Sequence, residues 1–171
     1  MANEPKPGEK LLLEDFKCIV MQTPLVSIDL IVRHADGRVW LGRRVNQPAK
    51  GTFFVPGGRI TKNETRTAAF ERITLAELGV RIKLSEATFV GSYDHIYKEN
   101  WFEDVAFGTH YVVLAYELAW RQSADPAATR QHAESCWKTE NEILDSGEVH
   151  ENTKAYFRGG RSPVGKPAVT S

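Results

Sequence analysis

The chain has 171 residues, of which 42% are hydrophobic and 26% charged, and these proportions are typical of one water-soluble globular domain. Its 22 basic side chains balance 22 acidic ones, which disfavours nucleic acid as a partner because proteins that bind it usually carry a basic excess. No apolar run approaches the roughly 20 residues that cross a bilayer, no signal peptide is evident, and two cysteines are too few for a disulfide framework. We therefore expect a cytoplasmic protein that does not bind membranes.

Composition along the chain predicts one domain between two flexible ends. Residues 1–9 are polar and contain prolines, and residues 159–171 show no hydrophobic periodicity, so both segments are expected to be flexible. Residues 10–158 then form a single domain.

The first half of that domain predicts three strands. Residues 25–32 are β-branched and aliphatic, as in a strand buried on both faces. Turn residues at 34–37 and the apolar segment 38–44 predict that a hairpin follows. Residues 52–58 predict a short strand that ends at a proline and two glycines.

A helix is predicted from Glu64 to Leu78, with Asn63 as its N-cap and Gly79 ending it. Beyond the helix, strands are expected at 87–97, 109–118 and 135–139, and a closing helix at 140–146 and 152–157; these ranges follow the apolar patterns. Strands interrupted by helices early and late predict an α/β fold with a mixed sheet between helices.

One acidic residue near the end of the predicted helix needs an explanation. Helical periodicity places positions 73, 76 and 77 on one face, and of these only Glu77 is acidic. A carboxylate at the negative end of a helix dipole is unfavourable by roughly 0.3–1 kcal/mol. A nearby divalent cation would explain it, and a solvated or arginine-paired surface glutamate is the alternative.

The segment 58–80 resembles the Nudix box, G-x5-E-x7-R-E-U-x-E-E-x-G-U, where U is a bulky aliphatic residue. Six positions match: Gly58, Glu64, Arg72, Glu77, Gly79 and Val80. Ile73 and Ala76 stand where the pattern has glutamates, and Thr74 where it has an aliphatic residue. The resemblance implies the Nudix fold, a mixed β-sheet sandwiched between α-helices, but with fewer metal-binding carboxylates than most members carry.

This loss of carboxylates resembles one Nudix branch, the GDP-mannose mannosyl hydrolases. The similarity extends over residues 14–160 and includes the segments EDF, TPLVSIDLIV, LGRR, FVPGGR, THYVVL, QH and KAYF. It implies hydrolysis of GDP-mannose, and of GDP-glucose, by attack of water at the anomeric carbon, giving GDP and free sugar with inversion.

The same resemblance implies one Mg²⁺ per subunit, with Mn²⁺ as a possible substitute. Its ligands would be the Glu77 carboxylate, the Gly57 carbonyl and the Gln131 side chain. One carboxylate with neutral oxygen ligands suits Mg²⁺, which takes its remaining ligands from water and phosphates. His132 matches the general base, a role that a histidine with an ordinary pKa near 6.5 can fill.

Five further residues match positions around the substrate. Arg44 would neutralise the departing diphosphate and Arg59 would contact a phosphate or the sugar, although Arg59 could instead pair with an acid such as Glu64. Tyr111 could donate its hydroxyl to the substrate or pack in the core. His95 and Asp29 match positions around the sugar, and a buried Asp29 would need a partner.

The N-terminal segment is assigned to base recognition and dimer formation by the resemblance alone. Phe16 would lie near the guanine, together with the chain around Lys10 and Leu11, in a homodimer. Packing of an N-terminal arm is the alternative role for Phe16.

Two other functions remain open from the sequence. A Nudix pyrophosphatase could cut a nucleotide sugar at phosphorus, with water prepared by a loop acid such as Glu99, Glu103 or Asp104. A nucleotide-sugar-binding module without catalysis is the other alternative, although an intact pair of Gln131 and His132 argues against it.

Overall fold

The computed structural model describes residues 6–9, 11–126 and 132–158. Its helices are α1 (Leu13–Gln22), α2 (Arg66–Leu78), the short 3-10 helix η1 (Leu84–Glu86), α3 (Glu140–Asp145) and α4 (Glu151–Arg158). Its strands are β1 (Leu25–Arg33), β2 (Val39–Arg44), β3 (Phe53–Phe54), β4 (Gly57–Arg59), β5 (Ala87–Tyr97), β6 (Thr109–Ala119) and β7 (His132–Lys138).

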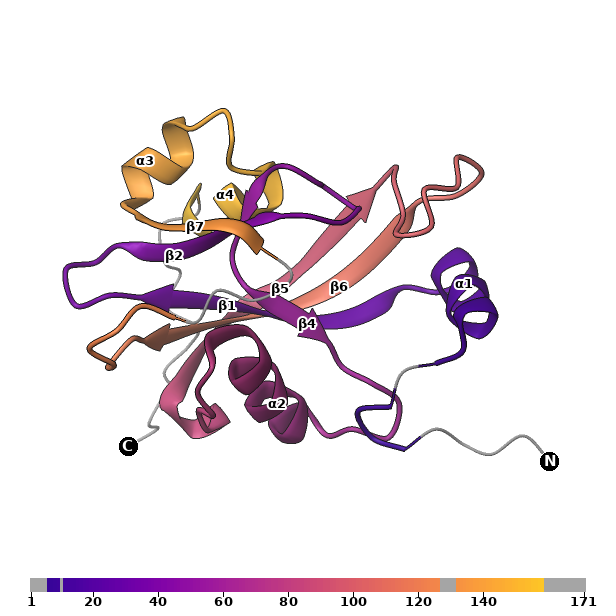
Figure 1. Ribbon diagram of the computed structural model, residues 1–171, viewed down its shortest axis with the longest axis horizontal. Helices are drawn as coiled ribbons and strands as arrows, with labels where there is room; N and C mark the ends of the chain where they lie inside the picture. The colour runs from indigo at the N-terminus through magenta and orange to yellow at the C-terminus, as the bar shows by residue number, and fades with distance from the viewer. Residues whose placement is uncertain (1–5, 10, 127–131, 159–171) are drawn as a thin grey trace, which may run out of the picture.

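The strands form one mixed sheet in the order β3-β2-β1-β6-β5, with β4 paired to β1 and β7 paired to β2. β1 and β6 run parallel, while the other pairs are antiparallel. Helix α2 covers one face, α3 and α4 cover the other, and α1 lies at one end (Figure 1). The predicted α/β class, with a mixed sheet between helices, is confirmed.

Alternating side chains of β1 supply two hydrophobic cores. Ile28 and Leu30 are fully buried in a cluster with Phe70 and Ile73 of α2. Ile31 points to the other face and packs in a second cluster that contains residues of α3 and α4. A strand buried on both faces, as predicted, therefore holds the helices of both layers.

Helix α2 begins later than predicted. Its N-cap is Thr65, whose hydroxyl accepts a hydrogen bond from the backbone N–H of Ala68, while Asn63 has a positive φ of 62°. Glu64 lies outside the helix, where Arg72 donates to both of its carboxylate oxygens at 2.6 and 2.7 Å. The sequence placed the cap two residues too early because Asn63 is as good a capping residue as Thr65. The helix ends at Gly79 in a left-handed conformation, as predicted.

The expected single strand at 52–58 is wrong, because Val55 and Pro56 separate two short strands. Gly57 and Gly58 begin β4, in which Gly57 lies opposite Asp29 and Gly58 opposite Ile28. A Cβ at Gly57 would come within 2.6 Å of Asp29 Oδ1, and a Cβ at Gly58 within 3.1 Å of Ile73 Cγ1. Both glycines are required by close packing of β4 between β1 and α2.

The remaining differences lie near the two ends of the chain. Helix α1 was not predicted: Phe16, Ile19 and Val20 form its partly buried stripe, but the exposed apolar residues Leu13 and Met21 obscure that pattern in the sequence. β7 is longer than expected, and the closing helix is two helices, α3 and α4. Residues 1–5 and 159–171 of the two predicted tails lie outside the described residues, and Gly8 N–H donates to Thr61 Oγ1 at 2.7 Å. No helix among the described residues is long and apolar enough to cross a membrane.

The packing of α2 on the sheet gives a first prediction. Replacing Ile73 with alanine should lower the free energy of unfolding by about 2–5 kcal/mol, because it leaves a cavity in the buried cluster. Leu75 lies on the same helix and is 44% exposed, so Leu75→Ala should cost less than about 0.5 kcal/mol. Urea unfolding of both variants measures the difference, and equal losses would contradict this account of the core.

Candidate active site

A cavity of about 610 Å³ collects most of the predicted site residues. It is bounded by α1, by strands β1 to β6, and by the loops beside them. The predicted residues that line it are Leu11, Phe16, Asp29, Arg44, Gly57, Arg59, His95 and Tyr111.

Strand register explains why these residues meet. Asp29 lies opposite Gly57 of β4 on one side and Ala115 of β6 on the other, and His95 of β5 lies opposite Tyr111 of β6. Side chains alternate between the two faces of a sheet, so these aligned positions point to the same face. The cavity therefore lies on the α3 and α4 face, opposite α2.

Two arginines form the cationic side of the cavity, and each rests on an aromatic ring. The Arg44 guanidinium lies 5.3 Å from the centre of the Phe54 ring, and that of Arg59 lies 3.9 Å from the centre of Phe16. Burial lowers the pKa of Arg59, although a guanidinium keeps its charge in proteins. Such fixed planar cations suit the oxygens of a diphosphate.

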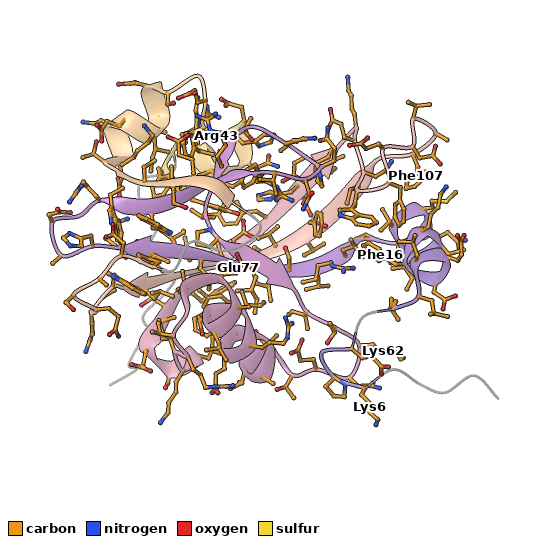
Figure 2. All side chains as sticks on the ribbon, viewed as in Figure 1. Lys6, Phe16, Arg43, Lys62, Glu77 and Phe107 are labelled. Atoms are coloured by element: carbon orange, nitrogen blue, oxygen red, sulfur yellow. The ribbon has the colours of Figure 1, made fainter. Side chains whose placement is uncertain are left out.

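The neighbouring charged residues are engaged elsewhere. Arg43 lies on the α3 and α4 side (Figure 2), where it binds Glu134 and Glu148 at 3.1 and 2.9 Å. Glu64, the possible partner of Arg59, is bound by Arg72 instead. Arg44 and Arg59 are therefore the guanidinium groups that line the cavity among the described residues.

Phe16 connects α1 to the cavity and to the loop between β5 and β6. One face of its ring carries Arg59, and the ring of Phe102 lies 5.5 Å away. Figure 2 shows Phe16 beside the loop that carries Phe107, and Lys17 of α1 binds Asp104 of that loop at 2.9 Å. A base that stacks on Phe16 would have to use the ring face away from Arg59.

The fully buried Asn100 organises that loop. Its side-chain amide donates to the carbonyls of Asp104 and Phe107 at 2.6 and 2.7 Å, and its carbonyl oxygen accepts from the backbone N–H of Phe102. Glu99, Glu103 and Asp104, the loop acids considered as alternative bases, do not line the cavity.

A hydrogen-bonded acid and histidine also line the cavity. The hydroxyl of Tyr156, from α4, lies 2.6 Å from Asp29 Oδ2 and 3.2 Å from His95 Nε2. Burial raises the pKa of Asp29 to about 6, opposed by the Tyr156 hydrogen bond and the charge of Arg44. Burial lowers the pKa of His95 to about 4, helped by His150 and Arg44, so its ring is neutral at pH 7.

Tyr111 is half-buried and borders the cavity between the two arginines and Asp29. Burial raises the pKa of its phenol, while Arg59 and Arg44 act in the opposite direction. The phenol is protonated at neutral pH and can donate a hydrogen bond to a ligand oxygen. Its position is compatible with both roles expected for Tyr111, hydrogen bonding to a ligand and packing, because the ring packs on the sheet and the residue lines the cavity.

Glu77 is 5% exposed and lies where α2 meets the sheet (Figure 2), but it does not line the cavity. Ile73 is buried beside it, whereas Ala76 is exposed. All three positions lie in one helix, as predicted, but of the three only Ile73 and Glu77 are buried. Glu77 is the one acidic residue of α2 that is buried against the sheet.

The rest of the predicted metal and catalytic set is only partly described. Gln131 and Lys10 lie outside the described residues. His132 begins β7, where its backbone lies opposite Arg44, but its side chain is outside the described part. The backbone pairing brings position 132 next to a cavity residue that is 88 positions away in the chain.

The donors that are described fit a hard cation. No group of three or more His, Cys, Asp or Glu residues able to hold a metal is found in the described ranges. The remaining candidates, a carboxylate of Glu77 and a carbonyl of Gly57, are oxygen ligands of the kind that Mg²⁺ prefers, and Mg²⁺ is usually held by few protein ligands plus phosphates.

Sequence reasoning missed several residues of the site. Tyr156 was matched as part of KAYF without a role, and Tyr97, Phe54 and Trp101 were not considered, although the last three line the cavity. Alternation along β5 could have found Tyr97, which lies two residues after His95 and shares its face. No local signal could have placed Tyr156 beside Asp29, 127 positions away.

The chain is similar to known proteins in both sequence and structure. The model of the NUDIX domain family matches residues 23–158. The low-salt glycan biosynthesis protein Agl8 of Haloferax volcanii is 40% identical over 113 residues, which cover 66% of this chain and 70% of that protein. A MutT NUDIX hydrolase from Burkholderia pseudomallei superposes with a TM-score of 0.64 at 25% identity, over 79% of this chain and 96% of that one. The MutT protein of Methanosarcina mazei has the same fold, with a TM-score of 0.63 at 18% identity, over 80% of this chain and 93% of that one.

The buried His95 predicts a pH dependence of stability. Its folded pKa of about 4 lies below the ordinary value of about 6.5. As pH falls between these values, the unfolded chain binds a proton that folded His95 does not, so the folded state loses stability. His95→Gln removes this proton-linked loss. Between pH 7.5 and pH 5, the free energy of unfolding should therefore fall by about 2 kcal/mol more in the wild type than in the variant. Urea unfolding at both pH values measures it, and a constant difference would show that His95 is not shielded from protons.

Proposed function

Because the chain is a member of the NUDIX domain family, we propose that it is a Mg²⁺-dependent hydrolase of GDP-mannose, and of GDP-glucose. In this proposal water attacks the anomeric carbon and the products are GDP and the free sugar, with inversion. The observation that carries the proposal is the sheet-facing side of α2, where Ile73 is a core residue and Glu77 is the one buried acid.

A single carboxylate limits what α2 can do. Hydrolysis at phosphorus by this family uses several helix carboxylates that hold cations and prepare the water. Glu71 of α2 pairs with Arg81, and Glu64 before the helix pairs with Arg72. Attack at carbon needs less from α2, because the diphosphate is then only the leaving group.

Mg²⁺ would be held by Glu77, the Gly57 carbonyl and Gln131, and when bound it would neutralise part of the charge of the diphosphate. The residues of the chain supply the other requirements. Arg44 and Arg59 bind the diphosphate oxygens, and Tyr111 donates a hydrogen bond beside them. Asp29 and His95, which also line the cavity, accept hydrogen bonds from sugar hydroxyls.

The proposed reaction needs one base. His132 would take a proton from the attacking water as the new C–O bond forms at the anomeric carbon. The old bond between that carbon and the diphosphate oxygen breaks, and its electron pair leaves with GDP. Attack on the face opposite the leaving group inverts the anomeric configuration.

Two further features support this substrate class. The relative Agl8 is named a low-salt glycan biosynthesis protein, which agrees with a sugar-related role. The cavity joins a cationic side that suits phosphates to a side of hydrogen-bond acceptors that suits hydroxyls. The homodimer and the cytoplasmic location implied by the resemblance stay predictions.

Product analysis in heavy-oxygen water tests the proposed function. Incubation of GDP-mannose with the protein and Mg²⁺ should give GDP and mannose, with the label in the sugar. GMP and mannose 1-phosphate, with label in a phosphate, would instead identify a pyrophosphatase. Binding of GDP-mannose without turnover over hours would identify a binding module.

The base assignment is tested by His132→Gln, which should lower kcat by about 10²–10⁴-fold while leaving the affinity for GDP-mannose little changed. His34→Gln is the matched control, because His34 lies in the turn between β1 and β2 and does not line the cavity. Near-normal turnover by His132→Gln would contradict the assignment.

The diphosphate contact is tested by a neighbouring pair of arginines. Arg44→Ala should weaken GDP binding by about 10- to 100-fold, since a charge-assisted hydrogen bond contributes about 1.5–3 kcal/mol. Arg43→Ala removes the same charge one residue away, but Arg43 does not line the cavity and instead contacts Glu134, Glu148, the Gly51 carbonyl and the Phe53 ring. Calorimetric titration with GDP measures both, and equal effects would mean that general charge, not contact, controls binding.

A further inference from the structure

The hydroxyl of Tyr156 connects two residues that line the cavity. It lies 2.6 Å from Asp29 Oδ2 and 3.2 Å from His95 Nε2, and thus joins α4 to β1 and β5. Tyr156 is 6% exposed and His95 3% exposed. Asp29 and His95 border the cavity, whereas Tyr156 lies behind them and does not.

Counting protons assigns the direction of both hydrogen bonds. A phenol has one proton to donate, and an ionised carboxylate can only accept. The shorter contact, to Asp29, therefore takes the Tyr156 proton. The phenol oxygen can then only accept from His95, so Nε2 must carry its own hydrogen. Burial supports this arrangement, because it raises the pKa of Tyr156 well above its ordinary value and keeps the phenol protonated.

A neutral imidazole that carries its hydrogen on Nε2 has an unprotonated Nδ1. Among the described residues, Tyr156 is the hydrogen-bond partner of the His95 ring, and it occupies Nε2. We propose that Tyr156 is a positioning residue that fixes His95 in the Nε2–H tautomer and so presents Nδ1 to the cavity as an acceptor for a hydroxyl of the bound hexose. The identity of the hexose rests on the proposed function, whereas the tautomer does not.

The consequence is selectivity by hydrogen-bond polarity. With Nδ1 unprotonated, both His95 and the Asp29 carboxylate accept hydrogen bonds, so this side of the cavity favours groups that donate. Sugar hydroxyls can donate, whereas the oxygens of an ionised phosphate only accept and would be repelled by Asp29. The substrate is thereby oriented with its sugar at Asp29 and its diphosphate at Arg44 and Arg59.

Packing holds the Tyr156 hydroxyl in place. Its ring meets that of Tyr93 edge-to-face at 4.7 Å and belongs to the buried cluster beneath α3 and α4. The segment before α4 is tied to β3, since Phe53 N–H donates to the Glu148 carbonyl and His150 N–H donates to the Phe53 carbonyl. The position of the Tyr156 hydroxyl is therefore set by this packing and not by the orientation of the His95 ring.

Nuclear magnetic resonance of the ¹⁵N-labelled full chain tests the tautomer directly. Long-range ¹H–¹⁵N correlation at pH 7.5, without ligand, distinguishes a protonated ring nitrogen from an unprotonated one. His95 should show a protonated Nε2 and an unprotonated Nδ1. The Nδ1–H tautomer, or a doubly protonated ring, would overturn the proposal in the wild-type protein, whatever the behaviour of any variant.

Tyr156→Phe then tests whether the tyrosine is the cause. This change removes one oxygen and keeps the ring that packs against Tyr93, so the resonances of the two His95 nitrogens should move towards each other as both tautomers become populated. Tyr93→Phe is the matched control, because Tyr93 contacts the Tyr156 ring but makes no hydrogen bond to His95, and its His95 spectrum should match the wild type. An unchanged spectrum in Tyr156→Phe would overturn the positioning role.

Kinetics connect the tautomer to substrate recognition. Tyr156→Phe should lower kcat/KM for GDP-mannose by about 10- to 100-fold and leave the Kd for GDP within about twofold, because GDP lacks the hexose. Equal losses of kcat/KM for GDP-mannose and of affinity for GDP would indicate a structural defect. That result would overturn the proposed hydrogen bond between His95 and the hexose. If the wild-type protein hydrolyses no GDP-mannose, the proposed function fails, while the spectra still decide the role of Tyr156.

Discussion

The pairing of β4 with β1 at Gly57 is the contact on which the rest of the site depends. Asp29 lies directly opposite Gly57, and any side chain there would collide with the Asp29 carboxylate. On the next residue, Gly58, the missing side chain admits Ile73 of α2. The two adjacent glycines therefore allow β4 to pack closely between β1, which carries Asp29, and α2, which carries Glu77.

This arrangement places the charged groups of the candidate site on two different faces of the sheet. On the cavity face, Arg44 and Arg59 are each fixed on an aromatic ring, while Asp29 and His95 are joined by the hydroxyl of Tyr156. On the α2 face, Glu77 is buried at the edge of the hydrophobic core. The glycine pair lies between the two faces, with the Asp29 carboxylate packed against Gly57 and the Ile73 side chain packed against Gly58.

Elements whose positions depend on short stretches of sequence were predicted correctly. The strands β1, β5 and β6 and the end of α2 at Gly79 follow from β-branched runs, alternation and a left-handed glycine, and their positions agree with the structure. The start of α2 was misplaced because Asn63 and Thr65 are both good caps, and in the structure Thr65 is the cap while Glu64 pairs with Arg72. Tyr156 could not be predicted, because its role exists only after α4 folds onto β1 and β5.

Ile73 explains why a change at one box position affects chemistry and packing together. In the Nudix pattern this position carries a glutamate, whose charge would need a cation to compensate for its burial beneath a glycine strand. Here Ile73 occupies this position and is 1% exposed. Its side chain packs against Gly58, where a Cβ would come within 3.1 Å of Ile73 Cγ1. The helix then gains hydrophobic stabilisation of roughly 1.5–3 kcal/mol from that side chain and lacks the carboxylate that the Nudix pattern places there. A chain with this substitution keeps its fold without metal charge at position 73. In the proposed function, α2 then contributes Glu77 alone, and the remaining substrate contacts are assigned to the arginines and the acid–histidine pair that line the cavity.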